Sequence, residues 1–160
     1  MTLLAWLIGL VLPACAGSGA AGLTQPVLMD LSHIERPASP NTALAGPAGT
    51  EPRPDTITPF YPVSAQQLFA TVIAVASGQP RTFLAAAYPA ALQAHFVARS
   101  AVFNFPDLIA VQVLAAGPGH SALVLYSRSV YGYSDFGVNR RRVDTWLAGV
   151  QTTINRTDER

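Results

Sequence analysis

Two strand-length segments that contain runs of consecutive apolar residues, 108–111 and 122–126, constrain the fold of this chain most. Residues 108–116 include LIAV and residues 121–130 include ALVLY, so neither segment alternates between apolar and polar side chains. A strand with one solvated face alternates with a period of two, whereas a strand covered on both faces need not. The sequence GPGH at residues 117–120 separates the segments and is typical of a hairpin turn. We therefore expect a central hairpin that is covered on both faces.

Two further strands and two helices are predicted around this hairpin. Residues 81–88 and 93–103 have strand-like patterns. Ser64 and Gln67 have the spacing of a capping box, which predicts the start of a helix before these strands. Apolar residues at helical spacing predict a last helix for which Asn139 is the expected N-cap. The predicted fold is α+β, a meandering antiparallel sheet of about four strands with an N-terminal and a C-terminal helix packed on one face.

The second face of this sheet also needs a cover, because two helices form only one layer. The candidate covers are a Gly/Ala/Pro-rich arm of this chain, a partner protein in the cell envelope, a second copy, or a lipid-like ligand. The arm, within residues 16–58, is the simplest of the four. The folded domain is expected over residues 59–155, and residues 156–160 are expected to form a frayed tail.

The N-terminal sequence has the features of a targeting signal. Residues 1–15 contain about a dozen consecutive apolar residues, which fits a signal peptide better than a bilayer span of about 20. The sequence LPAC at residues 12–15 resembles the lipobox of bacterial lipoprotein signals, in which Cys15 would carry the lipid. Cleavage after Ala16 and a short uncleaved apolar anchor are the alternatives. The expected location is the cell envelope, anchored to the membrane and facing the periplasm, or secreted to the periplasm as a soluble protein.

Charge and motif content exclude several function classes. The chain has 10 arginines and no lysine against 9 acidic residues, so its net charge of +1 does not provide the basic surplus that nucleic-acid binding needs. A single cysteine excludes a disulfide framework and a thiolate metal cluster. No Walker loop, HExxH, EF-hand loop or GxGxxG occurs, so no cofactor is expected.

One block of sequence is similar to a known family. The segment SDFGVNR at residues 134–140, preceded by a serine-bearing strand and followed by a helix, resembles the signature of the domain of unknown function 1499 family. RSAVFNFPD at residues 99–107 and Pro40-Asn41 resemble two more of its segments, so the resemblance covers roughly residues 37–150. Thr42 replaces a cysteine and Leu108 an aspartate that are common in the family. The resemblance implies no established activity.

The signature residues define a candidate binding site for a carboxylate or phosphate group. Arginine side chains with hydroxyl groups suit such anions, and these residues could gather at one end of the sheet. In the structural alternative, Asp135 pairs with Arg99 or Arg128 and the signature only shapes the corner between strand and helix. The candidate residues are Arg99, Ser100, Asp107, Ser127, Ser129, Asp135, Asn139 and Arg140.

We expect a binding or structural module rather than a catalyst, and no catalytic residue is assigned. The alternatives are a carrier of a small apolar or anionic, lipid-like ligand and a cofactor-independent hydrolase with Ser, His and Asp. The hydrolase would need a base, and the candidates are His33, His95 and His120. Three arginines at residues 140–142 lie where the helix dipole disfavours positive charge, which predicts acidic or carbonyl partners for them.

Overall fold

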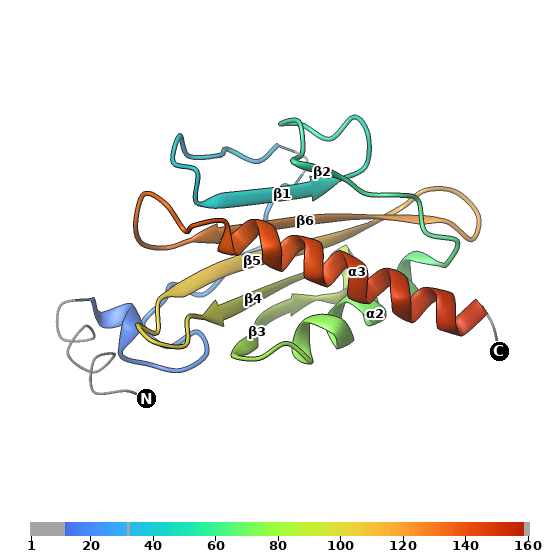
Figure 1. Ribbon diagram of the computed structural model, residues 1–160. Coiled ribbons are helices and arrows are strands. Elements are labelled where there is room, and N and C mark those ends of the chain that lie inside the picture. The colour runs from blue at the N-terminus through green and yellow to red at the C-terminus, as the bar shows by residue number, and fades with distance from the viewer. Residues whose placement is uncertain (1–11, 32, 159–160) are drawn as a thin grey trace.

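The computed structural model describes residues 12–31 and 33–158, so most of the apolar run at the N-terminus lies outside the described residues. A six-stranded sheet forms the centre of the structure, in the order β2-β1-β6-β5-β4-β3 (Figure 1). The strands are β1 (Thr42–Gly46), β2 (Thr56–Ile57), β3 (Thr82–Tyr88), β4 (Gln93–Arg99), β5 (Pro106–Ala115) and β6 (Ser121–Ser129). The helices are α2 (Ala65–Ser77) and α3 (Val138–Asp158), with single 3-10 turns η1 (Pro13–Cys15) and η2 (Pro89–Ala91).

The predicted α+β class is confirmed, and the strand number is corrected from about four to six. β3 to β6 form the expected antiparallel meander. β1 pairs antiparallel with β6, and the short β2 pairs parallel with β1, so the sheet is mixed. Both extra strands come from the segment that we expected to be an extended arm. For the same reason α2 is not N-terminal in the fold, because two strands precede it.

Long-range contacts explain why β1 was missed. Apart from Thr42, its sequence TALAG lacks the β-branched and aromatic residues that mark strands. Asp55 accepts the main-chain N–H of Leu44 at 2.8 Å and forms an ion pair with Arg36 at 2.8 Å. These contacts, together with the ladder to β6, hold β1 in the sheet although its own strand propensity is low.

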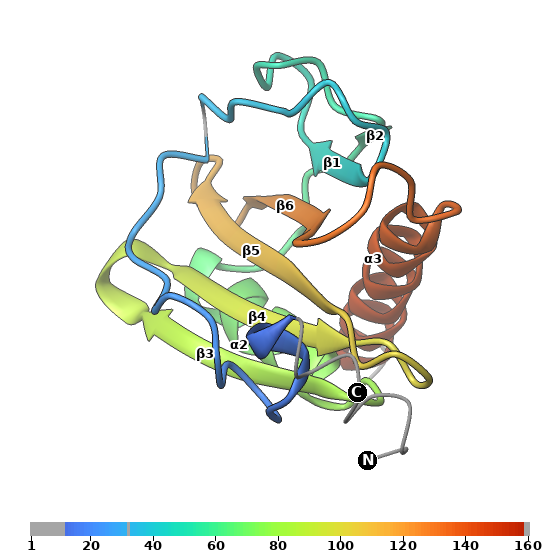
Figure 2. The same ribbon diagram turned by 90° about the vertical axis from the view of Figure 1, so that its left-hand side faces the viewer.

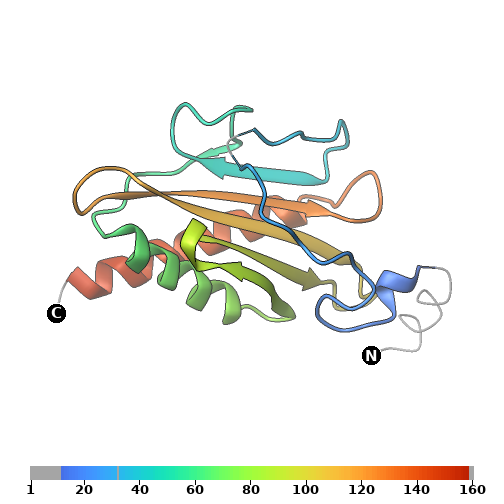
Figure 3. The same cartoon turned by 180° about the vertical axis from the view of Figure 1, so that it is seen from behind.

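Both helices cover one face of the sheet, as Figure 3 shows from the opposite side. The N-cap of α2 forms as predicted, with the Ser64 hydroxyl accepting the N–H of Gln67 at 3.2 Å. Trp146 of α3 packs edge-to-face on Phe96 of β4, with ring centroids 5.5 Å apart, and both side chains are buried. This helix-covered face contains the main apolar core.

The N-terminal segment lies across the other face. We call residues 12–31 the strap; it runs over β4 and β5 without regular strand structure (Figure 2). At its end, Leu31 packs together with Ile34 on Leu44, Val124 and Tyr126 in a second, smaller core. Part of the chain's own arm therefore covers the central hairpin on its second side, the simplest of the covers that the sequence suggested.

A close approach of the two helices gives a first prediction. A Cβ at Gly149 would lie 2.9 Å from Val75 Cγ1. We expect Gly149→Ala to destabilise the protein by about 1 kcal/mol, because overpacking outweighs the better helix propensity of alanine. In a Val75→Ala background the same change is expected to stabilise by about 0.5 kcal/mol. Urea unfolding of the four proteins measures the coupling, and equal effects in both backgrounds would contradict it.

Candidate functional site

The family-signature residues meet at the corner where β6 connects to α3. Asn139 is completely buried there. Its side-chain amide donates to Asn41 O at 3.0 Å and Ser129 Oγ at 2.9 Å, and its carbonyl oxygen accepts the Ser127 hydroxyl at 2.5 Å. The Asn41 side chain in turn donates to Gly132 O at 2.6 Å. Each of these polar groups is hydrogen-bonded to another group of the protein, as the structural alternative for the signature expects.

Asp135, rather than Asn139, caps the start of α3, which corrects the sequence prediction. Its carboxylate accepts the main-chain N–H groups of Gly137 at 2.9 Å and Asn139 at 2.7 Å. Burial opposes ionisation of this carboxyl, but the hydrogen bonds from Asn139 and Gly137 outweigh it and lower the pKa of Asp135. The predicted pairing with Arg99 or Arg128 is wrong, because the main-chain N–H groups at the helix start take both carboxylate oxygens.

The arginines at the start of α3 have the predicted acidic and carbonyl partners. Arg142 forms an ion pair with Asp107 at 2.7 Å and also donates to Asn139 Oδ1 at 2.7 Å. Arg141 donates to Phe136 O at 3.0 Å. Arg140 points outward and pairs with Asp144 along the helix surface at 3.4 Å. The sequence analysis included Arg140 among the candidate residues. In the structure, the arginine that joins the hydrogen-bond network of the corner is Arg142, which lies one helical turn after Asn139.

Two other candidate residues lie away from this corner. Arg99 is on the face of the sheet opposite α2 and α3, because it shares the alternation of His95 on β4 and not that of Phe96. Ser100 follows the end of β4, where its hydroxyl accepts the N–H of Phe105 at 2.9 Å. The eight candidates thus do not form one site. The alternation of side chains along the strands was a sequence signal that could have placed Arg99 and Ser127 on opposite faces of the sheet.

Arg99 fastens the strap to the sheet through main-chain carbonyl groups. Its guanidinium donates to Ala14 O at 2.6 Å, Gly19 O at 2.8 Å and Ala21 O at 2.9 Å. Burial lowers the pKa of Arg99, and within the described residues no carboxylate forms an ion pair with it. Asn104 adds hydrogen bonds to the carbonyl oxygens of Cys15 at 2.6 Å and Gly17 at 2.8 Å.

A second fastener holds the far end of the strap. The Gln93 amide accepts the N–H of Met29 and donates to its carbonyl oxygen, both at 2.8 Å. The Tyr88 hydroxyl donates to Pro26 O at 2.8 Å. Between the two fasteners the strap spans an open part of the sheet.

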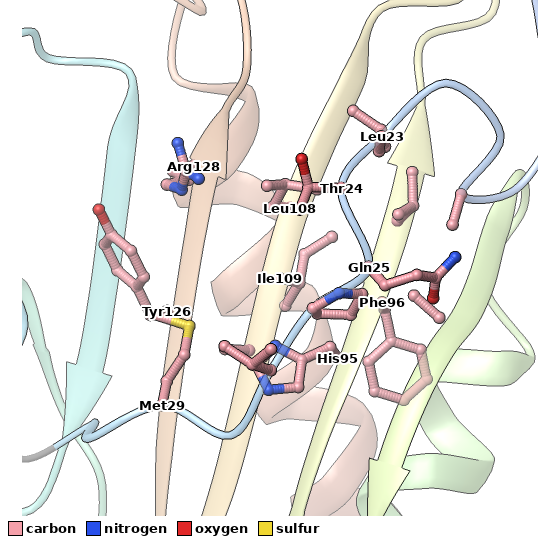
Figure 4. A pocket seen from close by; sticks show the side chains of 16 residues that line it. Leu23, Thr24, Gln25, Met29, His95, Phe96, Leu108, Ile109, Tyr126 and Arg128 are labelled. Carbon is pink, nitrogen blue, oxygen red and sulfur yellow. The ribbon is translucent and has the colours of Figure 1, made fainter. Parts of the chain in front are cut away.

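A cavity of about 240 Å³ lies beneath the strap. Its floor comes from β4, β5 and β6 and its roof from the strap, as Figure 4 shows. The lining is mostly apolar, with the imidazole of His95 in the floor and the exposed Arg128 at the edge. The residues that line it are Ala20, Leu23, Thr24, Gln25, Pro26, Val27, Met29, Ala85, His95, Phe96, Val97, Leu108, Ile109, Ala110, Tyr126 and Arg128.

The hydrogen bonds around His95 determine which ring nitrogen carries the proton. The two-way pairing with Met29 fixes the Gln93 amide, so Gln93 Oε1 can only accept. His95 Nε2 lies 2.9 Å from this oxygen and must be the donor. Burial lowers the pKa of His95 and favours the neutral ring, which leaves Nδ1 as a hydrogen-bond acceptor.

This placement separates the residues of the hydrolase alternative. Ser127 is on the helix-covered face and His95 on the strap-covered face, so the sheet lies between them. Ser100 is five residues further along β4, about 16 Å from His95 along an extended strand. His33 and His120 are exposed and contact Asp30 Oδ2 and Pro118 O, respectively. Among the described residues that line the cavity with His95, there is no serine, and an apolar lining of this kind can hold an apolar group.

Comparison with known proteins gives one match. A family model described as "Protein of unknown function (DUF1499)" matches residues 33–150, which include the whole sheet but not the strap. No curated protein and no solved structure matches the chain. Among residues 12–31 and 33–158, no helix is long and apolar enough to cross a bilayer, and no group of three or more potential metal ligands occurs.

The hydrogen bonds of Asn139 predict that substitutions at the adjacent residues Asn139 and Arg140 differ strongly in their effect on the free energy of unfolding. Asn139→Ala is expected to lower the free energy of unfolding by about 3 kcal/mol, because it leaves several buried polar groups without partners. Arg140→Ala, the matched control on the exposed side, is expected to change it by less than about 0.5 kcal/mol. Urea unfolding compares the two variants. Equal effects would show that the corner is not held by Asn139.

Burial of neutral His95 predicts a pH dependence of stability. The pKa of His95 is lowered from 6.5 in the folded protein, so the unfolded chain takes up this proton first. Stability is therefore expected to fall as the pH decreases below about 6.5, until the pH reaches the folded-state pKa. His95→Gln keeps a donor for Gln93 and removes this contribution. Urea unfolding between pH 7.5 and 5.5 should show a flatter profile for the variant, and parallel profiles would contradict the prediction.

Proposed function

This chain belongs to the DUF1499 family, and we propose that it is a non-catalytic binding module that holds a small apolar molecule with an anionic group. The observation that carries this proposal is the cavity between strap and sheet. This cavity combines an apolar lining with the imidazole of His95 in its floor and the guanidinium of Arg128 at its edge.

The cavity size fits a small ligand. At about 240 Å³ it is below the usual range of about 300–1,000 Å³ for drug-sized ligands. It is larger than the cavity of about 150 Å³ that binds benzene in an engineered protein. A medium-length acyl chain or a single substituted ring is therefore the appropriate class of apolar group.

Two polar residues of the cavity, Arg128 and His95, can orient the ligand. Arg128 is exposed at the cavity edge and has no ion-pair partner among the described residues, so it can bind a carboxylate that remains near solvent. His95 offers Nδ1 to a hydroxyl or another donor. An amphipathic monocarboxylate satisfies both the apolar lining and Arg128 without burying a charge.

We further propose that the module is attached to the membrane of the cell envelope, facing the periplasm, through its apolar N-terminal segment. Cys15 is completely buried, and its carbonyl oxygen is bound by Asn104. A lipid on the Cys15 sulfur would require residues 13–21 to leave the Arg99 fastener. Burial of Cys15 therefore favours the short uncleaved anchor over lipidation, and the hydrogen bonds to Ala14 O and Cys15 O favour it over cleavage after Ala16.

Binding of sodium octanoate tests the proposal. Saturation-transfer NMR on the full chain in nanodiscs of deuterated lipid is expected to show octanoate binding. Ala110→Phe, which fills the cavity from its floor, should abolish it, whereas Ala116→Phe in the exposed 116–120 turn should not. No binding to the unmodified chain, or equal binding by the two variants, would refute the cavity as the site.

Arg128 gives a second, charge-specific test. Arg128→Gln is expected to weaken octanoate binding by about fivefold, because an exposed ion pair contributes up to about 1 kcal/mol. Binding of octan-1-ol, which has the same chain and no charge, should stay unchanged. If both ligands lose affinity equally, Arg128 supports the cavity wall and does not bind the anionic group.

A further inference from the structure

We propose that one end of the domain, formed by the β4–β5 and β6–α3 loops, lies on the lipid bilayer and inserts aromatic side chains into its interface. This end face consists of residues 100–105 and 130–138. The proposal rests on the proposed membrane attachment and adds to it which surface of the domain contacts the lipid.

The end face exposes a concentration of large apolar side chains. Phe136 is 87% exposed and Tyr133 is 73% exposed, and Phe103 and Val138 are each about two-fifths exposed. Phe103 stacks on Phe105 with ring centroids 5.4 Å apart. Phe105 in turn contacts Tyr131 at 6.3 Å, which joins the two loops into one surface.

The ring of Phe136 adds little packing to the isolated domain. Its backbone has a φ of +53°, a conformation that is unfavourable for a bulky residue and inexpensive for glycine or asparagine. Its ring is almost wholly in solvent. A phenylalanine with both a strained backbone and an exposed ring needs a contact outside the domain to account for it.

The position of the N-terminus identifies lipid as that contact. Cys15 and Gly17 are hydrogen-bonded to Asn104, so the first described residues lie directly on the β4–β5 loop (Figure 1). The preceding sequence, residues 3–11, is LLAWLIGLV and contains no charged residue. A membrane segment that enters the domain at this point brings the end face to the bilayer. Aromatic rings are favoured at the level of the lipid headgroups.

The charges on the end face and next to it agree with a membrane surface. The carboxylates of Asp107 and Asp135 are occupied by Arg142 and by main-chain N–H groups, respectively. Within the described residues, neither Arg128 nor Arg141 has a carboxylate partner. An arginine of this kind is attracted to a surface of anionic lipid.

Depth measurement with a fluorescent label tests this orientation. A Cys15→Ser chain carries a single new cysteine, either Ser134→Cys on the end face or His120→Cys on the turn at the other end of β6. Each full chain is synthesised in the presence of phosphatidylcholine vesicles with one quarter phosphatidylglycerol and labelled with a nitrobenzoxadiazole dye. Nitroxide lipids then report the depth of the dye.

The label at residue 134 is expected to lie about 5–10 Å inside the interface. The label at residue 120 should remain unquenched, since the nine residues of β6 span about 30 Å. Adding Tyr133→Ser and Phe136→Asn is expected to remove the quenching at residue 134. The matched control, Ile57→Ser with Phe60→Ser, changes two exposed apolar residues outside the end face and the cavity and should leave it unchanged.

The outcomes separate this proposal from the proposed function. Vesicle flotation of the chain with equal quenching of both labels would show that attachment is right and the end face is wrong. Failure of the chain to float would overturn both the attachment and the end face. Neither result affects octanoate binding in the cavity, which is measured with different variants.

Discussion

The whole structure depends on covering both faces of β5 and β6. Both strands lie in the middle of the sheet, and their side chains are apolar on each face. Two helices meet this requirement on one side with a densely packed core around Trp146. On the other side the chain has only an irregular segment, which cannot interlock with a sheet as a helix does. The cavity results because both faces are apolar, but one is covered by two packed helices and the other by an irregular segment.

The strap also shows how a segment of low intrinsic structure is held in place. Arg99 and Gln93 bind it through main-chain carbonyl and amide groups, which every residue provides. Burying the Arg99 guanidinium without a carboxylate is costly, and several carbonyl oxygens in one cluster compensate for it. The same contacts place Cys15 in the interior. The strap lies outside the matched family region, whereas Arg99 and Gln93 lie inside it.

The sequence predicted those parts of the fold that depend on local pattern. The Ser64 cap, the antiparallel meander and the partners of the three arginines were foreseen because each follows from spacing, alternation or the helix dipole. β1 could not be foreseen, because its position depends on Asp55 and on β6 rather than on its own residues. The candidate site failed for a similar reason. Ser127, Ser129 and Asp135 lie around the buried side-chain amide of Asn139, and the cavity lies on the other face of the sheet.

The fasteners have a consequence for how this architecture can vary. Between Ala21, bound by Arg99, and Pro26, bound by Tyr88, four residues cross the sheet without a hydrogen bond to it among those described. Three of them, Leu23, Thr24 and Gln25, form part of the cavity roof. Lengthening or shortening this four-residue segment would change the volume of the cavity, while the sheet, the helices and both fasteners remained unaltered. Related chains could thus accommodate guests of different bulk by insertions and deletions alone.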